Sequence, residues 1–96
     1  MAFEAVEELV GKKRTLEILS VVDEEGILNY SDIENRVETS SDVVSNRLDM
    51  LVSYELLERI EKSKRNVRYS VTPKGERFLG RIAELEEFLR SENDYS

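Results

Sequence analysis

Residues 31–72 decide the fold, and they read SDIENRVETSSDVVSNRLDMLVSYELLERIEKSKRNVRYSVT. The first four residues, Ser-Asp-Ile-Glu, have the S-x-x-E form of a capping box, in which the first side chain caps a helix and the fourth reaches back to it. We therefore expect a short helix at about residues 32–37, with Ser31 as its N-cap and Glu34 at the third helical position.

A second helix is expected after a tight turn. Residues 38–41 (Glu-Thr-Ser-Ser) are typical of the turn, and Ser40 is a residue type that caps helix N-termini well. The apolar residues that follow recur at i, i+4, i+7 and i+8, which is helical spacing. They are Val44, Leu48, Leu51 and Val52. This helix is expected to bury one stripe and to expose the other.

The last part of the stretch predicts a β-hairpin. Leu56–Lys62 and Val67–Thr72 are the strand candidates, and apolar residues alternate with polar ones along the second. Residues 63–66 (Ser-Lys-Arg-Asn) join them and form a basic tip. Tyr69 is expected to lie in the core.

Helical patterns continue on both sides of this stretch. Two helices that meet near Gly11 are expected before it, and the second ends at Gly26, after which residues 27–30 form a short strand-like piece. Thr72 and Pro73 begin a last helix, as N-cap and first helical residue. Its apolar residues step by 4, 3 and 4, the spacing of a helix that packs along another helix. They are Phe78, Ile82, Leu85 and Leu89.

The predicted order is helix, helix, short strand, helix, turn, helix, hairpin, long helix, which is an α+β and mostly helical fold. Two short helices joined by a tight turn and followed by a hairpin form a winged helix-turn-helix. A chain of 96 residues is long enough for one core. We expect a single winged-helix domain over 1–96, with the helix-turn-helix at about 31–54, the wing at about 56–72 and a long C-terminal dimerisation helix at about 73–91.

The net charge of the chain is negative, but its cations are concentrated in two segments. The net charge of −7 by itself argues against a nucleic-acid partner. Residues 59–75, however, carry six cations against one acid, and they include the predicted hairpin tip, where a solvated basic loop suits contact with phosphate. Residues 11–14 carry three more cations, for which a merely solvated loop is an equally good interpretation.

The composition excludes several kinds of chemistry. The chain has no Cys and no His, so it offers no thiolate, no zinc site built from these residues and no Ser-His-Asp triad. Its acidic runs are typical of solvated faces, and its four glycines are isolated. We therefore expect no catalytic residue, metal site or cofactor, no evident small-molecule effector, and not an enzyme. Because no apolar run approaches the roughly 20 residues of a membrane span, we expect a cytoplasmic protein without membrane contact.

Three motifs in this order resemble the HxlR-like regulators of the broader MarR-like group. The segment GKKRTLEIL (11–19) is similar to the G-K-W-T-x-x-I-L opening of that family, with Arg14 where the family has Trp. Residues 40–59 resemble its S-x-x-x-L-S-x-R-L-x-x-L-x-x-x-G-L-I-x-R segment, with Glu55 in place of Gly. Residues 67–79 resemble V-x-Y-x-L-T-x-x-G-x-x-L. The resemblance implies a winged-helix transcriptional regulator that binds double-stranded DNA.

The exposed side of the second helix is the expected base-reading surface, and the basic wing is expected to contact phosphates or the minor groove. Asp42 is awkward in this position because a carboxylate repels DNA, so a role in stabilising the helix dipole is the alternative. For Arg47 the alternative to a DNA contact is an ion pair with a nearby acid. The expected DNA-binding residues are Ser41, Asp42, Ser45, Asn46, Arg47, Lys62, Lys64, Arg65, Asn66 and Arg68.

The last helix also predicts a homodimer, because its apolar seam is longer than a chain of this size needs for its own core. The expected interface residues are Phe3, Val6, Phe78, Ile82, Leu85, Phe88 and Leu89. A second class of function stays open. An acidic helix-turn-helix face would also suit a protein-interaction module that binds a basic protein partner.

Overall fold

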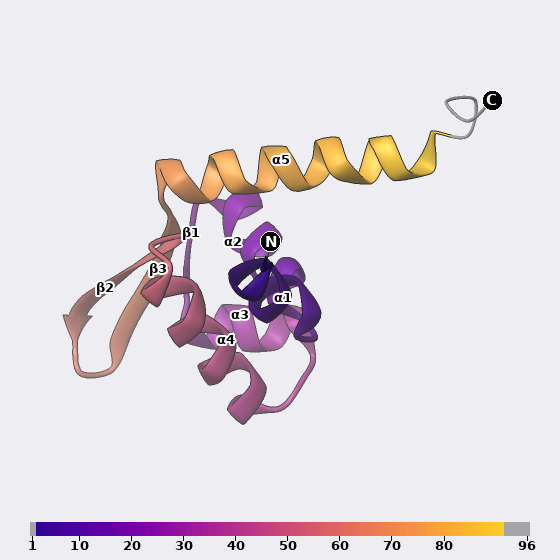
Figure 1. The fold of residues 1–96 in the computed structure, drawn as a ribbon. Helices are drawn as coiled ribbons and strands as arrows, with labels where there is room; N and C mark the ends of the chain where they lie inside the picture. The colour runs from indigo at the N-terminus through magenta and orange to yellow at the C-terminus, as the bar shows by residue number, and fades with distance from the viewer. Residues whose placement is uncertain (1, 92–96) are drawn as a thin grey trace.

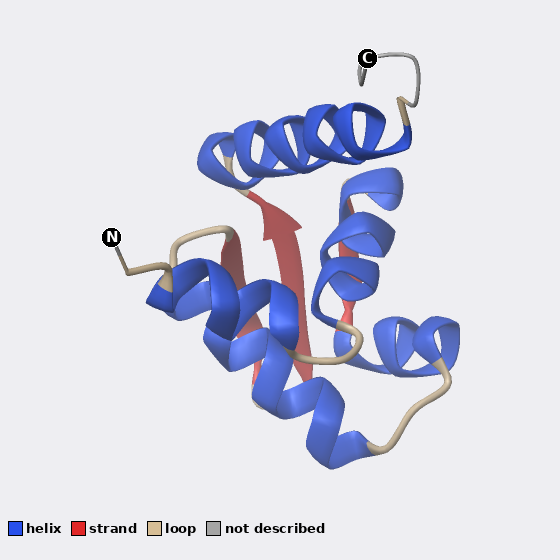
Figure 2. Cartoon of the chain, turned by 45° about the vertical axis from the view of Figure 1, so that its right-hand side comes forward, coloured by secondary structure: helices blue, strands red, loops and turns tan. Residues whose placement is uncertain are grey.

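The computed structural model describes residues 2–91, which form five helices and a small antiparallel sheet whose hairpin projects from the helical body (Figures 1 and 2). The order of elements agrees with the prediction. The elements are α1 (Glu4–Gly11), α2 (Thr15–Glu25), β1 (Ile27–Asn29), α3 (Tyr30–Val37), α4 (Ser41–Ser53), β2 (Leu57–Ser63), β3 (Asn66–Val71) and α5 (Pro73–Arg90). None of the helices within this range is long and apolar enough to span a membrane.

The sheet has the strand order β1-β3-β2, and both pairings are antiparallel. β2 and β3 form the wing, joined by Lys64 and Arg65, with a register irregularity between Glu61 and Ser63. The short piece after α2 is the third strand, β1, which pairs along the other edge of β3. The wing is therefore anchored to the helical body by the strand that directly precedes α3.

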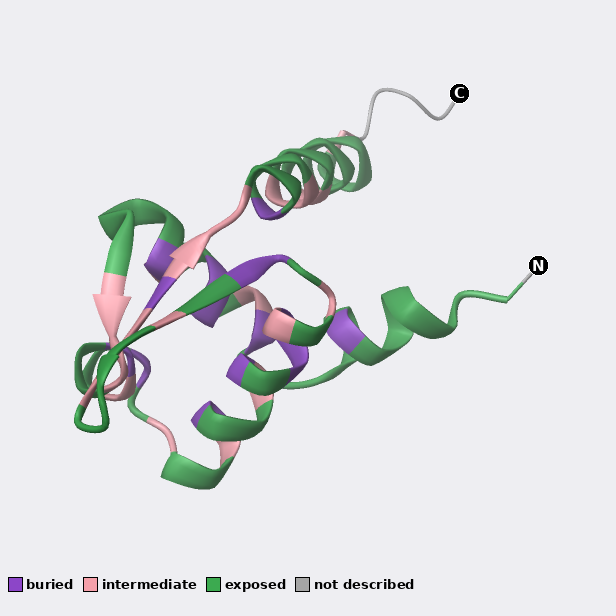
Figure 3. Ribbon diagram, turned by 90° about the vertical axis from the view of Figure 1, so that its left-hand side faces the viewer, coloured by how far each residue is buried: buried purple, intermediate pink, exposed green. Residues whose placement is uncertain are grey.

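The core lies between α2, α3, α4 and the sheet, as the buried segments in Figure 3 show. In the stripe predicted for α4, Val44, Leu48 and Leu51 are fully buried and Val52 packs against the core from its edge. Tyr69 is buried as predicted. Burial of these side chains removes apolar surface from water, and this is the main stabilising contribution to a fold of this size.

Two of the predicted helix caps are confirmed. The Ser40 hydroxyl accepts a hydrogen bond from the backbone N–H of Val43 at 3.3 Å, and the Thr72 hydroxyl accepts one from the N–H of Gly75 at 2.9 Å. Pro73 is the first residue of α5, where its missing N–H leaves no helical hydrogen bond unmade. These caps fix where α4 and α5 begin.

The prediction that Ser31 caps α3 was wrong. The helix begins two residues earlier than predicted, at Tyr30, and its cap is Asn29, whose side-chain oxygen accepts from the N–H of Asp32 at 2.9 Å. Asn29 is the last extended residue of β1, so pairing of β1 with β3 sets the point at which the helix can start. Glu34 does not complete a capping box, and its carboxylate instead accepts a hydrogen bond from the hydroxyl of Ser41.

The two hairpin strands are each displaced by one residue from the prediction. Leu56 is not the first residue of β2, because its N–H donates to the carbonyl of Leu51 at 2.9 Å and closes the end of α4. Thr72 is not the last residue of β3, because it caps α5. Both residues predicted to be in strands are therefore used by the ends of helices.

The first turn of α5 lies directly against the base of the wing. A Cβ atom at Gly75 would lie 2.2 Å from the backbone oxygen of Leu56 and 2.9 Å from a methyl group of Val71. Only a residue without a side chain allows this approach. Gly80, one and a half turns further along α5, has nothing within 4 Å of the same position.

We predict that Gly75→Ala and Gly80→Ala change stability in opposite directions. Gly75→Ala should lower the free energy of unfolding by about 1–3 kcal/mol, because α5 must move away from the Leu56 backbone. Gly80→Ala should raise it by about 0.5–1 kcal/mol, because alanine is the better helix former at an open position. Urea unfolding followed by circular dichroism measures both values. Equal effects of the two substitutions would show that the contact at Leu56 does not constrain α5.

Candidate nucleic-acid interface

Tyr30 connects the beginning of α3 to the first turns of α4. Its hydroxyl donates to the backbone oxygen of Ser41 at 3.1 Å and lies 3.0 Å from the hydroxyl oxygen of Ser45. The Ser41 hydroxyl donates to Glu34. Both serines predicted to contact DNA are exposed, and both are held from one side by α3.

The centre of the exposed side of α4 is a stripe that combines acids with an amide and a hydroxyl. Asp42, Asn46, Asp49 and Ser53 follow one another at steps of 4, 3 and 4 and are all exposed. Asp42 lies in the first turn, where its charge favours the helix dipole. The two alternatives for Asp42 are therefore compatible with its position. The amide nitrogen of Asn46 faces no recorded acceptor among residues 2–91.

Arg47 lies on the flank of α4 and is half-buried. Its Nε donates to the backbone oxygen of Lys13 at 2.8 Å, and one of its Nη atoms donates to the side-chain oxygen of Asn46. Within residues 2–91 Arg47 forms no ion pair with an acid, so the alternative interpretation of this residue does not hold there. Arg47 instead ties the loop between α1 and α2 to the middle of α4.

The register of the wing sorts its cations onto two faces, because residues directly opposite one another in neighbouring strands share a face. Arg59 lies opposite Tyr69, so it shares the inner face with a core residue. Arg68 lies opposite Ile60 and, across the sheet, opposite Asn29, so it belongs to the outer face. The structure therefore separates two cations that the sequence had placed in one basic segment.

At the tip, Lys64 and Arg65 are exposed, and neither has a recorded ion pair within the described part of the chain. Lys62 is also exposed, just before the tip. Asn66 is half-buried, and its side-chain oxygen accepts from Arg68 at 3.4 Å. Cations with free hydrogen-bond donors at an exposed tip can contact phosphate without first breaking an ion pair within the protein.

A hollow of about 350 Å³ lies between the wing and the beginning of α3. The wing contributes the cations Arg59, Lys64 and Arg65, and Tyr30 and Ser31 contribute polar groups from α3. Neither Arg59 nor Tyr30 is among the site residues predicted from the sequence. Arg59 was visible in the basic segment, but its face depends on a register with β3 that no local pattern sets.

Arg59 keeps its charge in this hollow. Its guanidinium forms an ion pair with Glu61 at 2.9 Å, and this hydrogen bond, followed by the effect of Tyr69, raises the pKa of Arg59. The pair with Glu61 is exposed, so its contribution to stability is small. Phosphate can therefore compete with Glu61 for the guanidinium.

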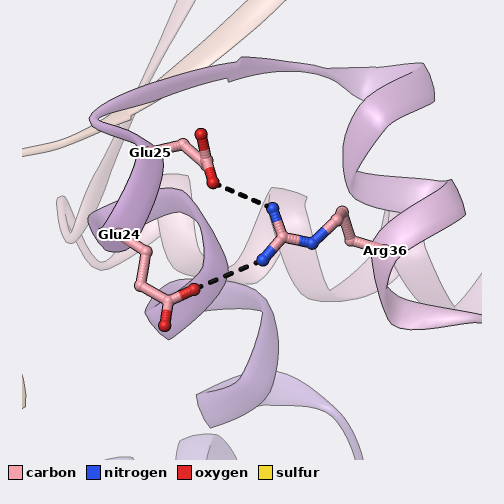
Figure 4. Close-up of polar contacts among 3 residues, drawn as sticks. All are labelled: Glu24, Glu25 and Arg36. Carbon is pink, nitrogen blue, oxygen red and sulfur yellow. Dashed lines mark hydrogen bonds and ion pairs between the residues drawn. The ribbon is translucent and has the colours of Figure 1, made fainter.

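Arg36 holds α3 against the end of α2 (Figure 4). Its two Nη atoms lie 3.0 Å from an oxygen of Glu25 and 3.3 Å from an oxygen of Glu24. Each pair is partly exposed and contributes at most about 1 kcal/mol. One guanidinium thus joins two consecutive acids and adds a small contribution to the packing of α3 on α2.

The predicted dimer residues divide into two groups. Phe78 packs against the core of its own chain, and Ile82 is half-buried. The others are at least half exposed, and Figure 3 shows α1 and most of α5 as exposed helices at the edge of the body. These exposed residues are Phe3, Val6, Leu85, Phe88 and Leu89. Exposed apolar residues become a candidate contact surface only where they form a continuous patch, as Leu85, Phe88 and Leu89 do by their spacing along α5.

The family model of the O-methyltransferase dimerisation domain matches residues 14–81. The chain belongs to this family. The match covers α2, the sheet, the helix-turn-helix and the first half of α5. Among the curated proteins compared with the chain, none matches.

Solved structures of MarR-family transcriptional regulators have the same winged-helix fold. One from Porphyromonas gingivalis W83 superposes with a TM-score of 0.73 at 25% identity, over 88% of this chain and 85% of that one. The reduced form of the regulator YodB from B. subtilis gives 0.76 at 23%, over 92% and 91%. The HTH-type transcriptional regulator ytcD gives 0.78 at 21%, over 92% and 93%. The predicted fold class is thereby confirmed.

YodB has also been solved in a quinone-bound form, which superposes with a TM-score of 0.76 at 24% identity over 90% of this chain and 91% of that one. A protein of this fold can therefore hold a small molecule. The expectation that this dimerisation-domain family member has no small-molecule effector stays a prediction.

We predict that Arg47→Ala destabilises the protein in the absence of DNA, whereas Arg65→Ala does not. Arg47→Ala removes the hydrogen bond to Lys13 and should lower the free energy of unfolding by about 1–2 kcal/mol. Arg65→Ala removes the same side chain from an exposed tip and should change stability by less than about 0.5 kcal/mol. Urea titration of DNA-free protein measures both. If Arg47→Ala unfolds at the wild-type midpoint, the bond to Lys13 does not hold the loop.

Proposed function

We propose that the protein is a dimeric, sequence-specific regulator of transcription that binds double-stranded DNA, with α4 in the major groove and the wing on phosphates or the minor groove. One observation carries the proposal. The free cations of the wing tip lie beside the helix-turn-helix of a fold that superposes along nearly the whole chain on MarR-family transcriptional regulators. The three ordered motifs support the narrower HxlR-like group.

The two elements have different tasks in this proposal. On α4, base edges are read by the neutral donors of Ser41, Ser45 and Asn46, since an Asn amide can pair with adenine at two atoms. The wing contributes charge through the tip residues Lys64 and Arg65, with Lys62, Asn66 and Arg68 beside them. Asp42 opposes binding if its carboxylate faces phosphates and otherwise acts on the helix dipole, and Arg47 acts on DNA chiefly by orienting Asn46.

The proposal includes a homodimer. Membership of a family of dimerisation domains supports it, as do the exposed apolar residues of α1 and α5. A two-fold axis between copies presents two α4 helices to successive major grooves, about 34 Å apart, when the site is a pseudo-palindrome. In this proposal the chain is a single winged-helix domain that acts in the cytoplasm. It uses no catalytic residue, metal, cofactor or effector.

A protein-interaction module is the second candidate, and the family match favours it because the family is described by dimerisation alone. Asp42 and Asp49 make the exposed stripe of α4 acidic, and the chain has a net charge of −7. In this alternative the acidic stripe of α4 binds a basic protein surface. If the protein binds DNA, removal of the wing cations weakens binding. If its acidic stripe binds a basic protein, removal of these cations does not weaken binding.

We predict that wing and α4 variants weaken DNA binding in different ways. Lys64→Ala with Arg65→Ala should weaken binding about equally on all duplexes and lower the slope of log K against log salt by about 1 for each phosphate interaction removed. Asn46→Ala should cost about 1–3 kcal/mol on a selected site and little on random DNA. Asp42→Asn should tighten binding if the carboxylate faces phosphates. Fluorescence anisotropy at several salt concentrations measures all three.

A site for these titrations comes from selection out of random duplex DNA. Lys74→Ala, on the first turn of α5, is the control for removal of one exposed cation outside the interface. Wild-type affinity of the wing variants and of Asn46→Ala on every duplex would reject the DNA-binding surface. The protein-interaction module would then be the better proposal.

We also predict that Phe88→Glu converts the dimer to a monomer. Phe88 is 57% exposed in the single chain, so a charge there costs the monomer little but would be buried in the dimer. Ile27→Glu is the matched control, because Ile27 is 42% exposed on β1 and lies outside the proposed interface. Sedimentation equilibrium at tens of micromolar protein should show a dimer for wild type and Ile27→Glu. A wild-type monomer, with and without DNA, would refute the dimer.

A further inference from the structure

The loop between α1 and α2 is the second concentration of positive charge in the chain. It contains Lys12, Lys13 and Arg14, and all three residues are exposed. The sequence left open whether this loop is only solvated. Its position in the fold bears on this question, because the loop does not stand alone on the surface but is attached to α4.

Two observations connect the loop to α4. The backbone oxygen of Lys13 accepts the hydrogen bond from Arg47 at 2.8 Å. Lys12 lines a hollow of about 330 Å³ together with Glu8 of α1 and with Asn46 and Asp49 of α4. The loop is thus held along one flank of the exposed stripe of α4. Tyr30, which contacts Ser41 and Ser45, is on the other flank, where the hollow beneath the wing begins.

The lysines of the loop are available to a ligand. Arg14 forms an ion pair with Glu17 at 2.9 Å, but neither Lys12 nor Lys13 has a recorded ion pair within residues 2–91. A surface hollow of about 580 Å³ is lined by all three cations, and Glu17 is the one acid in its lining. Glu8 of α1 lies in the same hollow as Lys12, but the two form no ion pair within the described residues.

We propose that the loop Gly11–Arg14 is a second phosphate-binding surface, which contacts the DNA backbone across the groove from the wing. The inference rests on the proposed DNA-binding function. A major groove is about 12 Å wide and is bordered by two phosphate backbones, so a helix of about 10–12 Å diameter inside it has one backbone on each flank. The wing cations lie toward one flank of α4, and Lys12 and Lys13 lie along its other flank.

The wing cations and the loop lysines then contact one phosphate backbone each, and together they orient α4 in the groove. Phosphate contacts carry no sequence information but set the register and angle of the reading element. Removal of the loop cations should therefore reduce affinity on all sequences, and it should lower the salt dependence in the same way as removal of the wing cations. Arg47 is a positioning residue for this surface, since it holds the loop through Lys13.

The test is the double variant Lys12→Ala, Lys13→Ala, titrated with random duplex DNA by fluorescence anisotropy at several salt concentrations. The backbone oxygen that accepts from Arg47 is kept, so thermal unfolding should match wild type. The slope of log K against log salt should fall by about 2, about 1 for each phosphate contact. The charge-conserving variant Lys12→Arg, Lys13→Arg should keep the wild-type slope.

Two controls separate the possible failures. Lys74→Ala, Arg77→Ala removes the same charge from the first two turns of α5 and should leave the slope unchanged. An equal decrease of slope in this control would show a long-range effect of net charge and would overturn the inference. A wild-type slope for the loop variant, with a reduced slope for Lys64→Ala, Arg65→Ala, overturns the loop contact and leaves the proposed function standing. No binding by wild type at low salt overturns the proposed function itself.

Discussion

The contact between the first turn of α5 and the backbone at Leu56 is the constraint on which the arrangement of the other elements depends. Gly75 allows the approach, and Thr72 secures it: its N–H donates to the Leu56 oxygen at 3.1 Å, and its hydroxyl donates to the Glu55 oxygen at 2.7 Å. The same hydroxyl caps α5. The end of α4, the base of the wing and the start of α5 therefore meet at one point.

This junction also explains a departure from the family pattern. Glu55 stands where the resembling regulators have Gly, and its φ of 63° is the left-handed conformation that glycine adopts most easily. A residue with a side chain costs about 1–2 kcal/mol there. The turn keeps this conformation because the N–H of Leu56 and the carbonyl of Glu55 are both hydrogen-bonded, to Leu51 and to Thr72. The wing therefore leaves α4 in one direction even without the glycine.

Local patterns predicted the elements, whereas contacts between distant residues decided what the patterns left undetermined. Periodicity predicted the buried stripe of α4, and residue type predicted the caps Ser40 and Thr72. The choice of Asn29 over Ser31 could not be made in the same way, because both residues cap helices and the pairing of β1 with β3 selects between them. The placement of Arg59 on the inner face of the sheet likewise depends on its register with Tyr69, and the hydrogen bond of Arg47 depends on Lys13, both far away in the sequence.

The net charge of −7 is a weaker guide to the partner than the placement of the charges. At physiological salt, interactions between exposed charges are largely screened beyond about 8 Å. The acids Glu84, Glu86 and Glu87 lie on the second half of α5, which extends away from the body in Figure 1, so they act little on a ligand at the wing. Asp42 and Asp49 share the exposed face with Asn46, so their repulsion of a ligand at this face acts over short distances and is not screened. For the proposed binding of DNA at this face, cations on both flanks of α4 must therefore outweigh its own two acids.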